Sequence, residues 1–171
     1  VSAAPDAGFS IVSWTAQAGT YTVGHGLASA PELIITKNKD TASGPWYTFT
    51  TAVDNTLDYL SLNTTGAALN DSFGTALPTA TVFSGTNNYF YSSGGMIAYC
   101  FHSVEGYSKI GSYVGNGATD GPFVYTGFRP SFLMYRRTDS VENWSMYDST
   151  REPFNVVDAT LRANNSDLEV P

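Results

Sequence analysis

Charged side chains are scarce in this sequence. Lys, Arg, Asp and Glu make up 13% of the 171 residues, about half the share of a typical soluble domain. Basic residues are the rarer kind, with 8 Lys and Arg against 15 Asp and Glu and a formal net charge of −7. An acidic chain repels phosphate backbones, so the composition argues against nucleic acid as a partner.

Cysteine and long apolar runs are also nearly missing. A single cysteine, Cys100, excludes an internal disulfide. It lies in the apolar stretch Met96–Phe101, which predicts a buried strand and a small core residue rather than a reactive thiol. Because no run of about 20 apolar residues is present, we expect no membrane insertion. The first residues lack Met and a basic region, so we expect a segment of a longer or processed chain rather than a signal peptide.

The residue patterns of common enzymes are missing too. The two histidines, His25 and His102, lie far apart, and His25 stands in a glycine-flanked turn. We therefore expect His25 to be a hydrogen-bonded turn or core residue rather than a base or a metal ligand. The sequence contains no nucleophile elbow, metalloprotease helix motif, phosphate-binding loop or zinc-spaced Cys/His cluster. We predict no enzymatic activity, no catalytic residue and no cofactor.

The carboxylates are scattered rather than grouped. A glycosidase needs two carboxylates that converge on one cleft, and a calcium loop needs a dense acidic spacing. The carboxylates near Trp144 and the two Asp/Asn pairs of the first half satisfy neither requirement, so we expect solvated loops and no metal site. These residues are Asp139, Glu142, Asp148, Asp158, Asp54–Asn55 and Asn70–Asp71.

What the sequence does contain is aromatic and β-branched residues in short segments. Aromatics reach 14% of the chain, and the segments end at Gly, Pro, Asn or Asp, a pattern typical of strands. The spacing predicts an all-β fold, an antiparallel β-sandwich with jelly-roll-like pairing, either as two similar lobes or as one composite sandwich. Ile35 and Met134 lie in near-continuous apolar runs, which predicts central strands buried on both faces. Helical patterns are limited to 57–62 and 156–161. The expected strands are 9–15, 20–23, 32–37, 47–51, 58–63, 80–83, 97–102, 108–114, 122–125, 132–136, 144–147 and 160–163.

The chain also repeats itself at about 98 residues. The segment Gly8–Trp14 is similar to Gly106–Tyr113, and Gly26–Lys37 is similar to Gly127–Arg136. We expect residues 1–7 to be an extension or linker, 8–105 a first repeat, and 106–171 a second repeat. The second repeat is apparently truncated, because it ends before the counterparts of the last two strands of the first. Such a unit has unpaired edges and an open core face, so the chain is either a fragment or is completed by strands from elsewhere.

Aromatic side chains supply the candidate binding residues. Tyr89, Phe90 and Tyr91 stand in a polar segment that ends in glycines, where rings could stack on sugars or enter a partner's pocket. The alternative is that alternate rings turn inward at a strand. Trp46 and Trp144 occupy matching places in the two copies, 98 positions apart, which favours a shared core role. We keep both tryptophans as weaker binding candidates.

Cations also match between the copies. Lys37 ends an expected strand of the first copy, and Arg136 and Arg137 end the matching strand of the second. We interpret these as solvated strand ends.

The longest motifs run from Tyr99 onward. They are Tyr99–Phe101, Val104–Lys109, Gly111–Gly117, Asp120–Pro130, Arg136–Asp139, Asn143–Trp144, Asp148, Arg151 and Pro153–Asn155, with counterparts in Gly8–Val12, Gly24–Leu27, Ala30–Pro31, Lys37–Asn38 and Leu62–Thr65. Together they resemble a repeated β-rich domain of unassigned function in virion proteins of tailed bacteriophages, many of them marine. The resemblance covers nearly the whole chain.

The resemblance implies a structural component of the virion: a tail fibre, a tail-tip protein or a capsid-surface protein. Its partners would be other virion proteins and copies of itself, with a trimer as one arrangement, and it would be assembled in the host cytoplasm. One hypothesis is a domain that binds a host-surface glycan, and a second is a purely architectural domain for capsid decoration or fibre assembly. A third is a polysaccharide depolymerase, although the resemblance supplies no catalytic residues.

Overall fold

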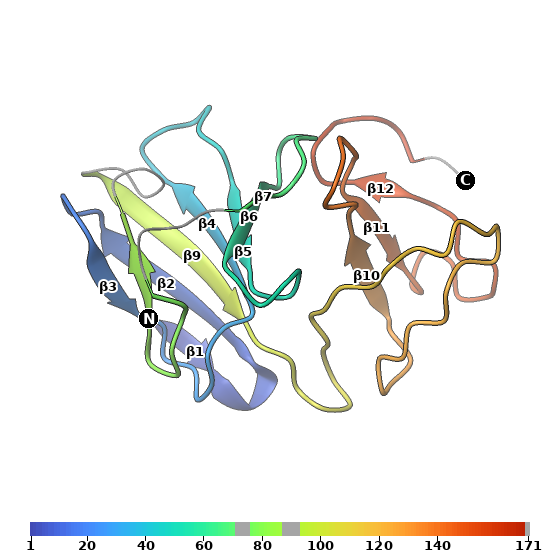
Figure 1. Cartoon of the computed structure of the whole chain (residues 1–171), viewed down its shortest axis with the longest axis horizontal. Coiled ribbons are helices and arrows are strands. Elements are labelled where there is room, and N and C mark those ends of the chain that lie inside the picture. Colours follow the sequence, from blue (N-terminus) through green and yellow to red (C-terminus); the bar gives the residue numbers. More distant parts are fainter. Residues whose placement is uncertain (71–75, 87–92, 170–171) are drawn as a thin grey trace.

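The computed structural model describes residues 1–70, 76–86 and 93–169 and consists of strands joined by turns. Figure 1 shows the strands up to residue 101 on one side of the molecule and three later strands on the other. The described residues contain no α-helix and a single 3-10 helix, η1 (Pro5–Ala7). All strand pairs are antiparallel. The predicted all-β class is therefore confirmed, whereas the helical patterns at 57–62 and 156–161 are wrong.

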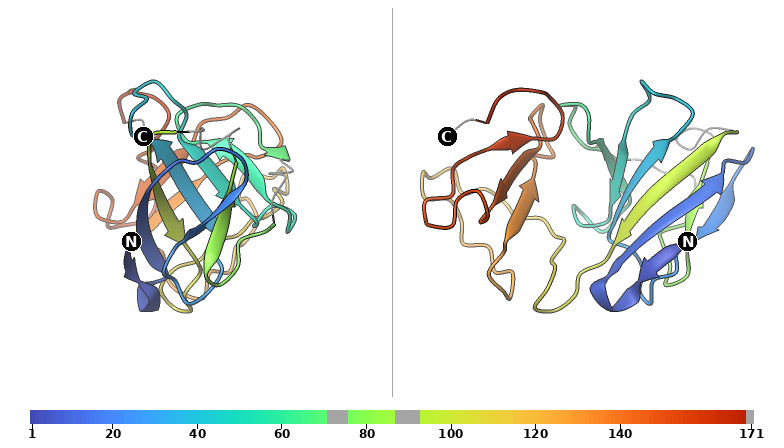
Figure 2. Two further views of the ribbon diagram at one scale, coloured as in Figure 1. Left: turned by 90° about the vertical axis from the view of Figure 1, so that its left-hand side faces the viewer. Right: turned by 180° about the vertical axis from the view of Figure 1, so that it is seen from behind.

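A seven-stranded sheet dominates the first half, with the strand order β1-β2-β9-β4-β5-β6-β7. Its strands are β1 (Ser2–Ala4), β2 (Phe9–Thr15), β4 (Leu33–Asn38), β5 (Tyr47–Thr50), β6 (Asp58–Ser61), β7 (Leu69–Asn70) and β9 (Gly95–Phe101). The strand β9 pairs with β2 on one edge and β4 on the other. It joins segments that are distant in sequence, as the views in Figure 2 show.

Alternation of side chains sets the buried face of this sheet. In β9, Met96, Ala98 and Cys100 are buried while the residues between them are half-buried. Successive side chains of a strand point to opposite faces, so these three point into the core. The buried core position predicted for Cys100 is confirmed, since this residue is 0% exposed.

A second, two-stranded sheet lies over the core face. It pairs β3 (Tyr21–Gly24) with β8 (Val82–Gly85), and its Val23 and Phe83 join the buried cluster. The ring of Trp14 meets Phe83 edge to face, with 5.7 Å between ring centroids. Burying one such large apolar side chain stabilises a fold by about 1.5–3 kcal/mol. The buried cluster comprises Val12, Ala16, Val23, Leu27, Ile34, Phe49, Leu57, Phe83, Met96, Ala98 and Cys100.

The second half carries a three-stranded sheet, β10 (Phe132–Tyr135), β11 (Ser145–Asp148) and β12 (Leu161–Arg162), in that order. Its strands pair in the same order and direction as β4, β5 and β6. The registers also correspond, with Leu33 opposite Thr50 in one sheet and Phe132 opposite Asp148 in the other.

The hydrogen bonds at the start of β5 and β11 correspond as well. The backbone N–H of Trp46 donates to Asn63 Oδ1 at 2.9 Å, and that of Trp144 donates to Asn164 Oδ1 at 2.8 Å. The carbonyl of each tryptophan in turn accepts a bond from the backbone N–H of Leu62 or Ala163.

Two strands expected in the second half are not formed. Residues 108–114 contain a single bridge, Val104 with Ser108, and residues 122–125 have no strand pairing. The counterpart of 108–114 is β2, which is held by β1 and β9. The described second half contains no strand in the place of β9, so this segment has no neighbouring strand with which to form a ladder.

The expectation for Met134 is also wrong. Ile35 is buried at 9% exposure as predicted, but Met134 is only half-buried, because β10 is an edge strand where β4 is central. No helix in the described residues is long and apolar enough to cross a membrane.

Candidate functional site

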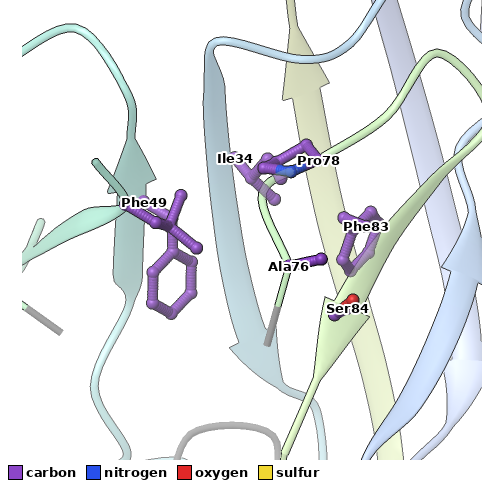
Figure 3. A pocket seen from close by; sticks show the side chains of 7 residues that line it. Ile34, Phe49, Ala76, Pro78, Phe83 and Ser84 are labelled. Atoms are coloured by element: carbon purple, nitrogen blue, oxygen red, sulfur yellow. The ribbon is translucent and has the colours of Figure 1, made fainter. Parts of the chain in front are cut away.

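A small pocket opens between the two sheets of the first half (Figure 3). Ile34 and Phe49 reach it from the large sheet, and Phe83 and Ser84 reach it from β8. Its other lining residues are Leu57, Ala76 and Pro78. None of the lining side chains is titratable, so the pocket is a packing gap in the core rather than a place for acid–base chemistry.

The buried histidine is hydrogen-bonded to the backbone through both of its ring nitrogens. His25 is 0% exposed, its Nδ1 accepts a hydrogen bond from the Leu27 N–H at 3.1 Å, and its Nε2 lies 3.0 Å from the Thr79 carbonyl. This arrangement requires the neutral ring with its proton on Nε2. Burial lowers the pKa of His25 below 6.5, against the opposing hydrogen bond to Thr79. The predicted core role of this residue is confirmed.

The carboxylates do not converge. Burial, assisted by the nearby Asp54 carboxylate, raises the pKa of Asp58, whose Oδ2 is buried without a hydrogen-bond partner. Asp139 and Asp148 are instead paired with Arg137 and Arg151, hydrogen bonds that lower the pKa of both carboxyls. Among the described residues, no three His, Cys, Asp or Glu side chains are grouped as metal ligands would be.

The thiol of Cys100 is similarly inert. Burial raises its pKa to about 12, and only the side chain of Ser10 acts in the opposite direction. A thiolate is therefore not accessible near neutral pH.

The aromatic binding candidates are separated by the fold. Tyr89, Phe90 and Tyr91 lie outside the described residues. Trp46 is half-buried before β5, and its ring stacks on Tyr99 of β9 at a centroid distance of 6.5 Å. The ring of Trp46, including its exposed part, therefore lies within the first half.

Trp144 is placed differently, at the contact between the two halves. It is 6% exposed, and its Nε1–H donates to the Ser61 carbonyl of the first half at 3.0 Å. The guanidinium of Arg136 lies 5.5 Å from the centre of the Trp144 ring, within the range of a cation–π contact. A buried ring of this kind holds the halves together and offers no face to a ligand.

Arg136 completes this contact. Its guanidinium donates to the backbone carbonyls of Ser61 at 3.2 Å, Thr64 at 3.1 Å and Gly66. Two backbone bonds run beside it, from Ala68 N–H to the Thr138 carbonyl at 2.7 Å and from Glu142 N–H to the Thr65 carbonyl at 3.0 Å. The loop that follows β10 is thus docked on the loop that follows β6.

The expectation of solvated cations is wrong for Arg136 and for Lys37. The Nζ of Lys37 donates to the carbonyls of Thr41, Ala42 and Gly44, and the residue is 9% exposed. Both cations bind backbone carbonyls of a loop, whereas Arg137 is solvated as expected, with 61% of its side chain exposed. Sequence reasoning missed the docking role of Arg136, and its only signal was the alignment with Lys37.

The most extensive unassigned feature is exposed apolar surface. Of the large exposed hydrophobic residues described, all but three lie beyond residue 105, and the buried hydrophobic residues there are Trp144 and Ala159. We call this set the second-half apolar surface. Its members are Tyr107, Tyr113, Val114, Phe123, Val124, Tyr125, Phe132, Leu133, Tyr135, Val141, Phe154, Val156 and Leu168.

Aligned residues show the contrast between the halves directly. Ile34 in β4 is 3% exposed, whereas Leu133 at the matching place in β10 is 48% exposed. Corresponding apolar positions of the two halves thus differ in burial.

Comparison with known proteins gives one family. Its sequence model, described as a domain of unknown function (DUF7483), matches residues 1–171. Searches of curated proteins and of solved structures found no match.

Proposed function

The chain belongs to the DUF7483 family over its whole length, and we propose that it is a non-enzymatic structural domain whose second half is an assembly surface. The observation that carries this proposal is the asymmetry of burial between the halves. The first half encloses a core between two sheets, while the second leaves its strands and rings exposed. Exposed apolar surface of this extent is stabilised by contact with another protein.

The finer architecture is part of the proposal. The first half is a jelly-roll-like sandwich of the large sheet and β3–β8, and residues 106–171 are an incomplete second copy of the same unit. The corresponding registers of β4–β6 and β10–β12 support this view, as do the matching hydrogen bonds of Trp46 and Trp144.

The setting proposed for this domain is the virion of a tailed bacteriophage, as a tail-fibre, tail-tip or capsid-surface component. The support is the sequence resemblance described above. Other virion proteins and further copies of the chain would then be its partners, and the particle would be its location.

The burial pattern favours assembly over glycan recognition. Sugars bind on exposed aromatic faces beside polar side chains, but the ring of Trp144 is enclosed between the halves. Trp46, half-buried on Tyr99, remains as a sugar platform among the described candidates.

Sedimentation of the purified chain over a range of concentrations tests the proposal. We expect association that increases with concentration and weakens at least about tenfold when Phe123, Tyr125 and Phe154 are changed to Ser. Leu77→Ser, at an exposed apolar residue of the first half, is the matched control. Mass spectrometry of purified phage particles that encode the chain tests its location.

Other outcomes would replace the proposal. A chain that stays monomeric, binds glycans on an array and loses them with Trp46→Ala would be a receptor-binding domain. Release of reducing sugar from host polysaccharide would make it a depolymerase.

A further inference from the structure

We propose that the outer edge of β10 accepts an antiparallel β-strand with the residue pattern of β9. The inference rests on the proposed assembly role and names the chemistry of the partner: an uncharged strand of about seven residues with small or medium apolar side chains at alternate positions. Strand addition at an open sheet edge is an established mode of protein recognition.

The first half provides the template for this contact. The strand β4 is hydrogen-bonded on both edges, to β5 and to β9. Leu33 lies opposite Phe101 of β9, and Asn38 lies opposite Met96. The added strand thereby brings Met96, Ala98 and Cys100 over the core.

In the second half the corresponding strand position, beside the outer edge of β10, is open. We call this position the open seat. The strand β10 pairs with β11 in the register of β4 with β5, but its other edge has no strand among the described residues. Phe132 is 59% exposed and Leu133 is 48% exposed. An edge strand with apolar side chains and free backbone groups is a template for pairing.

Two glycines give independent evidence that this strand position is open. Gly8 and Gly106 occupy matching places and share a left-handed backbone, with φ of 65° and 72°. A Cβ at Gly8 would lie 2.5 Å from the carbonyl oxygen of His102, just after β9, whereas a Cβ at Gly106 would meet nothing within 4 Å. Gly106 therefore keeps the backbone angle of Gly8, while the space that the end of β9 fills beside Gly8 is empty beside Gly106.

The neighbouring ring indicates the end of the missing strand. Phe9, next to Gly8, packs on Phe101 at the end of β9 with ring centroids 4.8 Å apart. Its counterpart Tyr107 is 66% exposed. We infer an aromatic residue at the last position of the partner strand.

The test adds a β9 peptide to the full chain. The peptide carries residues 93–103 with Cys100→Ser and lysines at both ends for solubility, and binding is measured by fluorescence anisotropy and amide hydrogen exchange. We expect saturable binding and exchange at least about tenfold slower at the outward amides of Phe132–Tyr135. A peptide with Tyr99→Pro is the control, because the Tyr99 N–H faces β4 in the first half and proline cannot donate to the ladder.

Variants of the chain locate the contact. Leu133→Asp should reduce peptide affinity at least about tenfold, since it places a charge on the covered face. Leu77→Asp, at an exposed apolar residue of the first half, should leave affinity unchanged. Gly106→Ala should weaken binding through the clash that a Cβ makes at the seat.

Two results would overturn the inference. One is a folded chain, with β9 amides protected, that binds neither peptide. The other is protection of Phe132–Tyr135 that rises with chain concentration and is indifferent to peptide, which would make a second copy the occupant. If the chain assembles through its apolar surface while β10 stays exposed, the inference fails and the assembly role stands.

Discussion

His25 illustrates how this fold holds a polar side chain in its core at the scale of one residue. The imidazole has a backbone donor on one nitrogen and a backbone acceptor near the other. Protonation of Nδ1 would remove the acceptor for the Leu27 N–H and place a charge at a fully buried position. The folded state therefore favours the neutral form of the His25 ring.

We expect the free energy of unfolding to depend on pH through this group. Burial lowers the pKa of His25 in the folded state, so the unfolded chain binds more protons as the pH falls below about 6.5. Stability is thus full above that value and declines below it, by up to about 1.4 kcal/mol per pH unit. Urea unfolding from pH 8 to 5 measures the slope.

Two glutamine variants isolate the contribution of His25. His25→Gln keeps a donor and an acceptor but does not titrate, so the slope near pH 6 should flatten. His102→Gln, the matched control, should retain it. A slope that persists in His25→Gln would show that another group carries the pH dependence.

Strand pairing explains, at the scale of elements, which expectations held. The strand predicted at 9–15 coincides with β2, and the strands expected at 47–51 and 58–63 correspond to β5 and β6. Local pattern is enough there because each segment finds a partner. The segments 108–114 and 122–125 carry similar patterns, but the described second half has no counterparts of β9 and β8 for them to pair with. Strand propensity alone therefore does not order them.

Short elements and docking contacts left little trace in the sequence. The strand β1 consists of Ser2–Ala4, which has no apolar alternation and is paired only because β2 offers an edge. The bonds of Arg136 go to backbone carbonyls, and a carbonyl has no residue signature. The candidate site was therefore predicted only in part, through the alignment of Trp46 with Trp144.

The matched glycines give a prediction at this scale. Gly8→Ala combines a left-handed backbone with a clash at the end of β9, while Gly106→Ala has the backbone term alone. We expect Gly106→Ala to cost about 1–2 kcal/mol and Gly8→Ala to cost about 1–3 kcal/mol more. Denaturant unfolding of the two variants provides the comparison, and equal costs would contradict the account of the open seat.

Contact between the halves governs the molecule as a whole. The first half has its own core, whereas the second has little beyond Trp144 and Ala159. The position of the second half depends on a polar contact, in which Arg136 and Trp144 bind carbonyls at the end of β6 and in the loop after it. Order in the second half is thus coupled to that loop.

Replacing Arg136 should weaken the contact that holds the second half to the first. Arg136→Ala removes the charged donor from the Ser61 and Thr64 carbonyls, and a hydrogen bond to a charged group contributes about 1.5–3 kcal/mol. We expect chymotrypsin to cleave the stretch between residues 102 and 130 at least about tenfold faster. Arg137→Ala, which loses only its exposed pair with Asp139, should be cleaved at the original rate, and equal rates for both variants would refute the role of Arg136.

The hydrogen bonds that Arg136 makes to backbone carbonyls of the first half have an evolutionary consequence. Its acceptors are main-chain oxygens of Ser61, Thr64 and Gly66, which every amino acid possesses. The loop after β6, apart from Asn63, whose side chain binds the Trp46 N–H, can therefore accumulate substitutions without breaking this contact, as long as its path is kept. Selection at this contact falls almost wholly on one arginine and one tryptophan, so relatives could diverge in their loops while keeping the same angle between units.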